Sequence, residues 1–262
     1  MHKINAIILD WAGTTVDYGC FAPVNAFISA FAAFNIEAGT EETRAPMGMA
    51  KRAHVEKMFE SENIARQWKE KYGRTHNAKD IDAVYALFEP ALFETLTKYT
   101  DPIRGVIDCV KKIREMGIPI GSTTGYTKVM MDTVAPSAKE KGYAPDCMVC
   151  PEDVDGKGRP YPFMLWRNLE ALKVMSIHNT LKIGDTVADI EEALNAGCPS
   201  VGVIKGSSML GLSEKEVENM GETDLLSLMK ACKKRYLDAG ANYVIDDISE
   251  LPALIETINN FK

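Results

Sequence analysis

The sequence predicts an α/β protein with a Rossmann-like core, built on a parallel sheet, and a helical cap domain inserted after the first strand. Three observations lead to this prediction. Short apolar runs alternate with amphipathic segments over most of the chain. One long stretch near the N-terminus holds helical patterns only. Acidic or hydroxyl side chains directly follow several of the apolar runs, which indicates a site at the carboxyl ends of the strands.

Six apolar runs are predicted to be the strands of the core, and these are residues 6–10, 118–123, 147–150, 180–184, 200–204 and 243–245. Amphipathic helical patterns lie between strands, at 106–116, 162–173 and 190–196. This alternation is typical of βαβ units. Gly117 and Gly197 supply C-caps for two helices, and Ser213 with Glu216 forms a capping box that opens another. We therefore assign residues 1–19 and 100–262 to the core.

Residues 20–99 are predicted to form the cap. Helical periodicity covers 23–34, 50–60, 64–72 and 79–98, with no convincing strand between them. An insertion at this place would lie over the mouth of the sheet, with hinges near Tyr18-Gly19 and Asp101-Pro102. The aromatic residues Phe27, Phe31 and Phe34 allow two interpretations, either the core of the cap or a surface for a second subunit.

Bulk composition narrows the class of protein. The chain has 262 residues, of which 46% are hydrophobic and 26% charged, as in ordinary globular proteins. A net charge of -7 argues against a broad nucleic-acid surface, and no apolar run approaches the ~20 residues that span a bilayer. The N-terminus enters a strand without a signal-peptide pattern. We expect a cytoplasmic protein with no nucleic-acid or membrane partner.

The six cysteines are scattered, unlike a disulfide framework. Cys147 and Cys150 match C-x-x-C, but no second pair of ligands follows at zinc-finger spacing. We interpret this segment as a short strand that leads to Pro151, and a redox or metal site is the weaker alternative.

Four segments that follow predicted strands carry residues suited to phosphoryl chemistry. Asp10 can attack phosphorus or bind a metal, and residues 122–125 bring hydroxyls and N–H groups to a helix start, where anions bind. Arg159 offers a guanidinium to phosphate oxygens. Asp185 and Asp189 follow a fourth strand as candidate Mg²⁺ ligands. Each segment alone is commonly a cap, a turn or a surface residue, but four at successive strand ends predict one site.

Two further positions refine the chemistry. Ala12 stands two residues after Asp10, where a second acid would predict an ordinary phosphatase, and it can offer a metal only its backbone carbonyl. In the cap, Gly48 precedes a helix that carries Lys51 and His54 on one face. A lysine in a closed, desolvated site loses proton affinity and can attack a carbonyl. Periodicity alone favours the alternative, a solvated lysine on an exposed helix.

The chain resembles the haloacid dehalogenase superfamily of aspartyl-phosphate enzymes. The resemblance rests on Asp10 with Ala12, on the Ser/Thr segment that points to Thr124, on Asp185 with Asp189, and on the helical insertion. It implies attack by Asp10 on phosphorus and one Mg²⁺ per subunit, held by Asp10, Asp185 and the carbonyl of Ala12. Asp189 would be a supporting acid.

Within that superfamily, the chain looks like the phosphonoacetaldehyde hydrolase family over essentially its whole length. The motifs are residues 10–17, the segment around Lys51, residues 122–126, 158–162 and 206–212. The resemblance implies hydrolysis of a carbon–phosphorus bond through a Schiff base on Lys51, for which an acid at position 12 is unnecessary. It also implies a homodimer, formed through the cap.

The remaining roles are hypotheses. His54 is the candidate for proton transfer during imine formation. The substrate-binding residues are expected to be Cys20, Met47, Gly48, Thr124, Gly125, Tyr126 and Arg159. Two alternatives stay open: a phosphate-monoester phosphatase or phosphomutase of the same superfamily, and a catalytically silent phosphate-binding protein.

Overall fold

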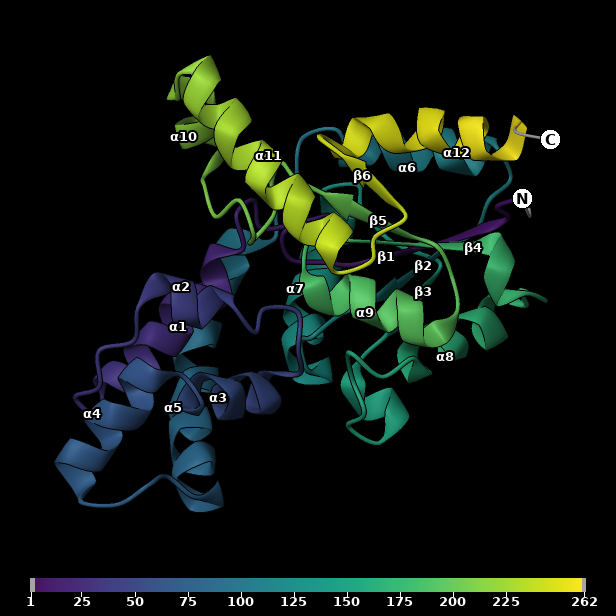
Figure 1. Cartoon of the computed structure of the whole chain (residues 1–262). Helices are drawn as coiled ribbons and strands as arrows, with labels where there is room; N and C mark the ends of the chain where they lie inside the picture. Colours follow the sequence, from purple (N-terminus) through teal and green to yellow (C-terminus); the bar gives the residue numbers. More distant parts are fainter. Residues whose placement is uncertain (1–2, 261–262) are drawn as a thin grey trace.

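A six-stranded parallel sheet forms the centre of the chain, in a computed structural model that describes residues 3–260 (Figure 1). The strand order is β3-β2-β1-β4-β5-β6. The strands are β1 Ala6–Leu9, β2 Ile120–Thr123, β3 Cys147–Val149, β4 Thr180–Gly184, β5 Ser200–Val203 and β6 Tyr243–Ile245. All six predicted strands are therefore present, and the predicted α/β class is confirmed.

Helices cover both faces of the sheet, which explains why its strands are apolar without alternation. In β1, Ile7 and Leu9 join the main core, whereas Ile8 packs with Leu165 and Ala193 on the other side. Figure 1 shows α6 and α12 on one face and α8 and α9 on the other. These helices are α6 Val106–Glu115, α8 Phe163–Leu172, α9 Val187–Ala196 and α12 Leu251–Asn260.

The register of the central strands brings their carboxyl ends to one edge. Leu9 pairs with Ser122 of β2 and with Ile183 of β4. The chain order reverses here, because β2 lies on one side of β1 and β4 on the other. Ligands of open α/β sheets bind in the crevice at such a point, and Asp10 comes directly after β1.

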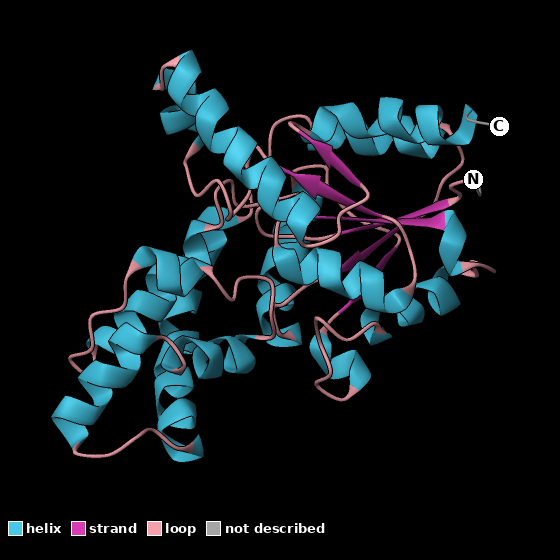
Figure 2. Ribbon diagram, in the orientation of Figure 1, coloured by secondary structure: helices cyan, strands magenta, loops and turns pink. Residues whose placement is uncertain are grey.

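The predicted cap, residues 20–99, contains helices and no strand, and all of it is described (Figure 2). Its elements are α1 Phe21–Ala32, α2 Thr40–Arg44, α3 Lys51–Phe59, α4 Glu62–Tyr72, α5 Ala78–Leu96 and the 3-10 turn η1 Thr97–Tyr99. Four of the helices match the predicted ones within a few residues. Helix α2 was not predicted, since five residues are too few to show a helical period. The boundaries between the two domains stay a prediction.

Phe27 and Phe31 of α1 belong to the core of the cap. Phe27 is fully buried and stacks on Phe88, with ring centroids 4.1 Å apart. Phe31 is also buried and meets Phe59 edge to face at 5.1 Å. Phe34 is half-buried near Trp68. The interpretation as cap core is thus confirmed for Phe27 and Phe31, and the homodimer stays a prediction from the resemblance.

The other elements complete the core. They are α7 Lys128–Glu140, α10 Glu214–Asn219, α11 Glu222–Asp238 and the turns η2 Pro151–Val154, η3 Ile177–Asn179 and η4 Ile248–Glu250. The capping box of Ser213 and Glu216 is present. Cys147 lies in β3, so the predicted short strand is present, and all six cysteines are free. Within residues 3–260, no helix has the length and apolar character to cross a membrane.

Candidate active site

Three buried carboxylates meet at the carboxyl edge of the sheet. Asp10 follows β1, Asp185 follows β4, and Asp189 lies in the first turn of α9. One oxygen of each lies within 4.8 Å of the others. Gly13 makes this approach possible, because a Cβ there would lie 2.2 Å from Asp185 Oδ2 and its φ of 91° also favours glycine. Asp10 is 175 positions from Asp185 in the sequence, and Asp185 is four positions from Asp189. The fold thus brings together acids that are distant in the chain.

Arg159 links the nucleophile candidate to two other acids. Its Nη2 is 2.7 Å from Asp10 Oδ1, its Nη1 is 3.1 Å from Asp189 Oδ1, and its Nε donates to Glu192 Oε2 at 3.0 Å. These acids raise the pKa of the guanidinium against the opposing effect of burial. Burial raises the pKa of Asp10, although Arg159 opposes that shift. Arg159 therefore lies where it can neutralise charge around Asp10.

Asp185 and Asp189 differ in how their charge is balanced. Both oxygens of Asp189 accept hydrogen bonds, Oδ1 from Lys182 Nζ at 2.6 Å and Oδ2 from Thr186 Oγ1 at 2.6 Å. Burial alone would raise the pKa of Asp189, but Arg159 and Lys182 hold it below its ordinary value. Asp185 Oδ2 accepts from Ser208 N at 2.8 Å, whereas Oδ1 is buried without a partner.

The unpartnered oxygen of Asp185 fits a divalent cation. Burial, followed by repulsion from Asp10 and Asp189, raises the pKa of Asp185 well above its usual value. Hard cations such as Mg²⁺ take carboxylate and carbonyl oxygens. Asp10 and Asp185 could each supply one, and Ala12 lines the same cavity. Both oxygens of Asp189 already accept hydrogen bonds, from Lys182 and Thr186. This suits its expected role as a supporting acid rather than a metal ligand.

Two residues of this network were missed by the sequence analysis. Lys182 lies in β4 with no exposed surface, 2.6 Å from Asp189 Oδ1 and 3.6 Å from Glu192 Oε2. Glu192 is equally buried on α9. A signal was present, since a lysine inside a buried strand requires an acidic partner, and Glu192 stands three residues after Asp189, on the same helix face.

Lys51 faces the carboxylates from the cap. It is the first residue of α3 and only 4% exposed. Its Nζ lies 4.8 Å from the ring centroid of Tyr126 and 5.9 Å from that of Phe27. Burial lowers the pKa of Lys51, while Cys20 and Asp10 act in the opposite direction. The alternative of a solvated lysine is therefore wrong for this structure.

His54 lies one turn behind Lys51 and outside the cavity lining. Its Nε2 donates to the carbonyl of Thr43 at 2.8 Å, and its ring stacks on Phe27 at 3.9 Å. Nδ1 is buried without a partner. Burial and the nearby charge of Lys51 hold the pKa of His54 well below its usual value. His54 is therefore a neutral imidazole with Nδ1 as the unused acceptor.

Cap and core enclose a cavity of about 20 Å³, room for little more than one water molecule. Its lining residues are Asp10, Ala12, Cys20, Met47, Gly48, Lys51, Thr124, Gly125, Tyr126, Arg159, Asp185 and Thr186. Every residue expected in the site lines it except His54 and Asp189, and Thr186 is an addition. A cavity of this size holds no organic substrate, so we expect the cap to open when one enters.

Close backbone contacts shut this cavity. A Cβ at Gly48 would lie 2.3 Å from Thr186 Oγ1, and one at Gly125 would lie 2.6 Å from the carbonyl oxygen of Met49. Thr124 Oγ1 accepts from Tyr126 N at 3.0 Å and fixes the core loop beneath. Glycine on both sides thus lets the cap loop lie directly on the strand-end loops.

Known proteins resemble this chain over nearly its whole length. Residues 4–197 match the family model of haloacid dehalogenase-like hydrolases. The phosphonoacetaldehyde hydrolase of Bacillus cytotoxicus is 47% identical over 98% of this chain and 97% of its own. A bifunctional phosphonoacetaldehyde hydrolase/aminoethylphosphonate transaminase of Clostridioides difficile is 48% identical over 99% of this chain, which spans only 41% of that longer protein.

A solved structure has the same architecture. The crystal structure of a phosphonoacetaldehyde hydrolase-like protein from Oleispira antarctica superposes with a TM-score of 0.94 at 36% identity, covering 98% of this chain and 92% of its own. The agreement extends through both the sheet and the helical insertion.

Proposed function

Because the chain belongs to the haloacid dehalogenase-like hydrolases, we propose that it hydrolyses the carbon–phosphorus bond of phosphonoacetaldehyde to acetaldehyde and phosphate. The names of its relatives support this substrate. The observation that carries the proposal is the shared cavity of Asp10 and Lys51, in which burial favours the neutral amine. A carboxylate nucleophile and an amine nucleophile thus face one small space.

The lysine solves the problem of the leaving group. A bare carbanion is a very poor leaving group, so the electrons of the carbon–phosphorus bond need an acceptor. The neutral amine of Lys51 attacks the aldehyde, water leaves, and a protonated imine forms. When Asp10 attacks phosphorus, the bonding pair moves into this iminium group, and an enamine leaves instead of a carbanion.

Water completes the reaction at both residues. One water molecule hydrolyses the phosphoryl group from Asp10 and releases phosphate. The enamine takes a proton on carbon, and a second water molecule hydrolyses the resulting iminium, which releases acetaldehyde and restores the Lys51 amine. Since imine formation released one water, the net reaction consumes one.

The core residues supply positive charge during phosphoryl transfer. Arg159 lies 2.7 Å from Asp10 and is placed to balance the phosphoryl oxygens. A bound Mg²⁺, held by Asp10, Asp185 and the carbonyl of Ala12, would add Lewis-acid neutralisation of the same oxygens. Asp189 holds Arg159 in place and is itself paired with Lys182.

His54 is assigned to proton transfer at the Lys51 amine. Its neutral ring lies behind Lys51 with Nδ1 as the available acceptor. His54→Ala is expected to reduce turnover across the pH range, and unchanged turnover would remove the role.

Substrate preference tests the whole proposal. The purified chain with Mg²⁺ should release acetaldehyde and phosphate from phosphonoacetaldehyde in equal amounts, measured by coupled reduction of the aldehyde and by a phosphate assay. Sugar phosphates should be poor substrates, because Ala12 has no proton to give a leaving alkoxide. Faster release from a sugar phosphate would favour the phosphatase alternative, and phosphate binding without turnover would favour the silent protein.

A further inference from the structure

Residues 206–212, here called the bridging loop, contact three parts of the molecule at once. The loop follows β5, and the carbonyl of Gly206 accepts from Gly19 N at the hinge, at 2.7 Å. Ser208 N donates to Asp185 Oδ2 at 2.8 Å. The carbonyl of Ser208 accepts from Arg44 Nη1 of the cap at 3.0 Å. The loop therefore connects the hinge, the cap and an acid of the active site.

Arg44 is the cap residue in this connection. It is the last residue of α2, and its Nη1 also donates to the carbonyl of Gly19 at 2.7 Å. Its guanidinium carbon lies 5.1 Å from the ring centroid of Phe21. Gly211 of the bridging loop packs against the guanidinium of Arg44, since a Cβ at Gly211 would lie 3.2 Å from Arg44 Nε. One side chain thus binds the hinge and the bridging loop together.

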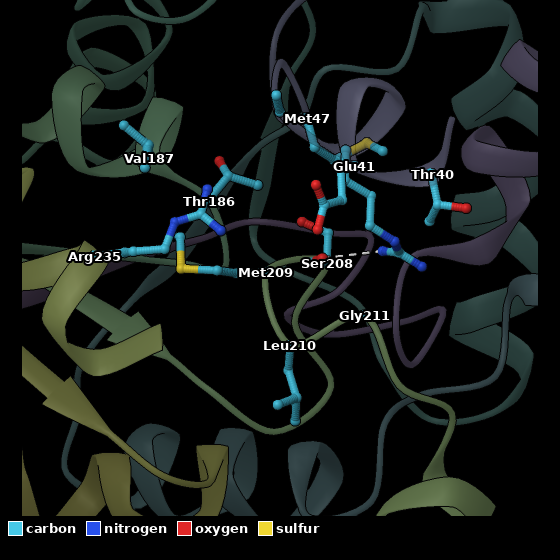
Figure 3. A pocket seen from close by; sticks show the side chains of 12 residues that line it. Thr40, Glu41, Met47, Thr186, Val187, Ser208, Met209, Leu210, Gly211 and Arg235 are labelled. Carbon is cyan, nitrogen blue, oxygen red and sulfur yellow. Dashed lines mark hydrogen bonds between the residues drawn. The ribbon is translucent and has the colours of Figure 1, made fainter. Parts of the chain in front are cut away.

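Figure 3 shows the surroundings of this contact. Thr40 and Glu41 of α2 and Ser208, Leu210 and Gly211 of the bridging loop line a cavity of about 520 Å³ between cap and core. The dashed line at Ser208 marks its hydrogen bond with Arg44. The hydrogen bond of Arg44 therefore joins α2 to the bridging loop at the edge of this cavity.

We propose that Arg44 is a positioning residue that latches the cap over the active site. The chain runs from Arg44 through Met47 and Gly48, which line the catalytic cavity, directly into Lys51. Fixing Arg44 on the bridging loop therefore fixes Lys51 relative to Asp185. Hydrogen bonds from a charged donor are stronger than those between neutral groups, so two of them make an effective closure.

Arg52 provides a matched comparison on the same cap. Its guanidinium pairs with Glu56 at 3.7 Å and with Asp82 at 2.8 Å, both of which are cap residues. Its side chain is 45% exposed. Replacing Arg52 removes a cap arginine of the same size without touching the contact between cap and core.

Chemical labelling of Lys51 tests the latch without substrate. Wild type, Arg44→Met, Gly211→Ala and Arg52→Met would each be treated with trinitrobenzenesulfonate, and labelling of each lysine followed by peptide mass analysis. Lys51 is 4% exposed in the closed form and becomes reactive only when the cap opens. Lys182, which has no exposed surface in the core, reports global unfolding.

Arg44→Met is expected to speed labelling of Lys51 about tenfold or more, because it removes hydrogen bonds from a charged donor. Gly211→Ala is expected to speed it by a smaller factor, because its Cβ would displace the Arg44 guanidinium without removing a donor. Labelling of Lys182 should not change in either variant. Arg52→Met should match wild type. Gly211→Ala disturbs the contact between Arg44 and the bridging loop from the core side. It therefore tests the latch even if Arg44→Met does not fold. Unchanged labelling of Lys51 in both variants, or an equal rise in Arg52→Met or at Lys182, would overturn the latch.

A kinetic measurement adds a readout that depends on the proposed function. With phosphonoacetaldehyde, Arg44→Met should raise KM and lower kcat, because closure is needed both to hold the substrate and to align Lys51 with Asp10. Failure of wild type to cleave phosphonoacetaldehyde would sink the proposed function. The labelling result would still stand, since it needs no substrate.

Discussion

Among residues 3–260 two lysines are buried, one in the cap and one in the core, and their surroundings are opposite. Lys182 lies between Asp189 and Glu192 and also contacts the carbonyl of Ile183 at 3.3 Å. Lys51 lies against the rings of Tyr126 and Phe27, at the N-terminus of α3, where the helix dipole disfavours a cation. Burial lowers the pKa of Lys51.

The difference separates a structural lysine from a chemical one. A buried ammonium that is paired with acids fixes the geometry of its partners. A buried ammonium that forms no ion pair loses its proton more easily, because burial penalises the charged form, and it becomes a nucleophile. Beneath Asp10, the core pairs the cations Arg159 and Lys182 with acids. The cap brings to this site the amine of Lys51, which burial makes easier to deprotonate.

The largest expected effect is loss of activity on replacing the cap lysine. Lys51→Met should reduce phosphonoacetaldehyde cleavage by a factor on the order of 10⁴ or more, as is usual when a covalent nucleophile is removed. Steady-state release of acetaldehyde measures it. A variant with a tenth of wild-type activity would show that the amine is dispensable, and the comparison of the two lysines would fail.

Replacing the core lysine should act on stability instead. Lys182→Met leaves Asp189 and Glu192 with less positive charge in a dry interior, so the free energy of unfolding should fall by about 3–5 kcal/mol. Urea unfolding measures the change. Lys230→Met on the exposed face of α11 is the control and should stay within about 0.5 kcal/mol of wild type. A Lys182 variant as stable as this control would contradict the paired role.

A bound divalent cation should neutralise the charge of Asp185, which neither Arg159 nor Lys182 contacts. Asp185 has an unpartnered oxygen and a raised pKa, so Mg²⁺ at a hundred times its dissociation constant should stabilise the folded chain by about 2.7 kcal/mol. Thermal unfolding with Mg²⁺ and with a chelator measures this. Asp185→Asn should lose most of the stabilisation, and an undiminished response in that variant would place the cation elsewhere.

Cleavage activity should also disappear with the chelator and return with Mg²⁺.

The smallest expected effect is a pH-dependent gain in stability on removing Lys51. Its pKa is lower in the folded than in the unfolded chain, so the folded state carries a penalty at neutral pH. That penalty disappears as the pH rises to about 10.4, where the unfolded lysine also loses its proton. Lys51→Met should therefore be more stable than wild type at neutral pH, and the difference should shrink toward alkaline pH. A difference that is constant with pH would mean that lost or gained packing causes it.

The sequence predicted the core site better than the cap site, for a physical reason. Asp10 and Asp185 follow apolar runs, and parallel strands bring their carboxyl ends together whatever lies between. Lys182 and Glu192 were overlooked because their partners are set by the packing of α9 on the sheet. Nothing local in the cap sequence distinguishes Lys51 from an exposed lysine, and only the resemblance singled it out. The contact of Arg44 with the bridging loop joins residues 164 positions apart and depends on how the cap closes.

Borohydride reduction in the presence of phosphonoacetaldehyde tests the central claim most directly. Reduction would trap an imine as a stable secondary amine, and peptide mass analysis would locate the added two-carbon group. The predicted result is one adduct on Lys51 and none on Lys182. Active enzyme that shows no adduct on Lys51 under these conditions would contradict the Schiff-base mechanism.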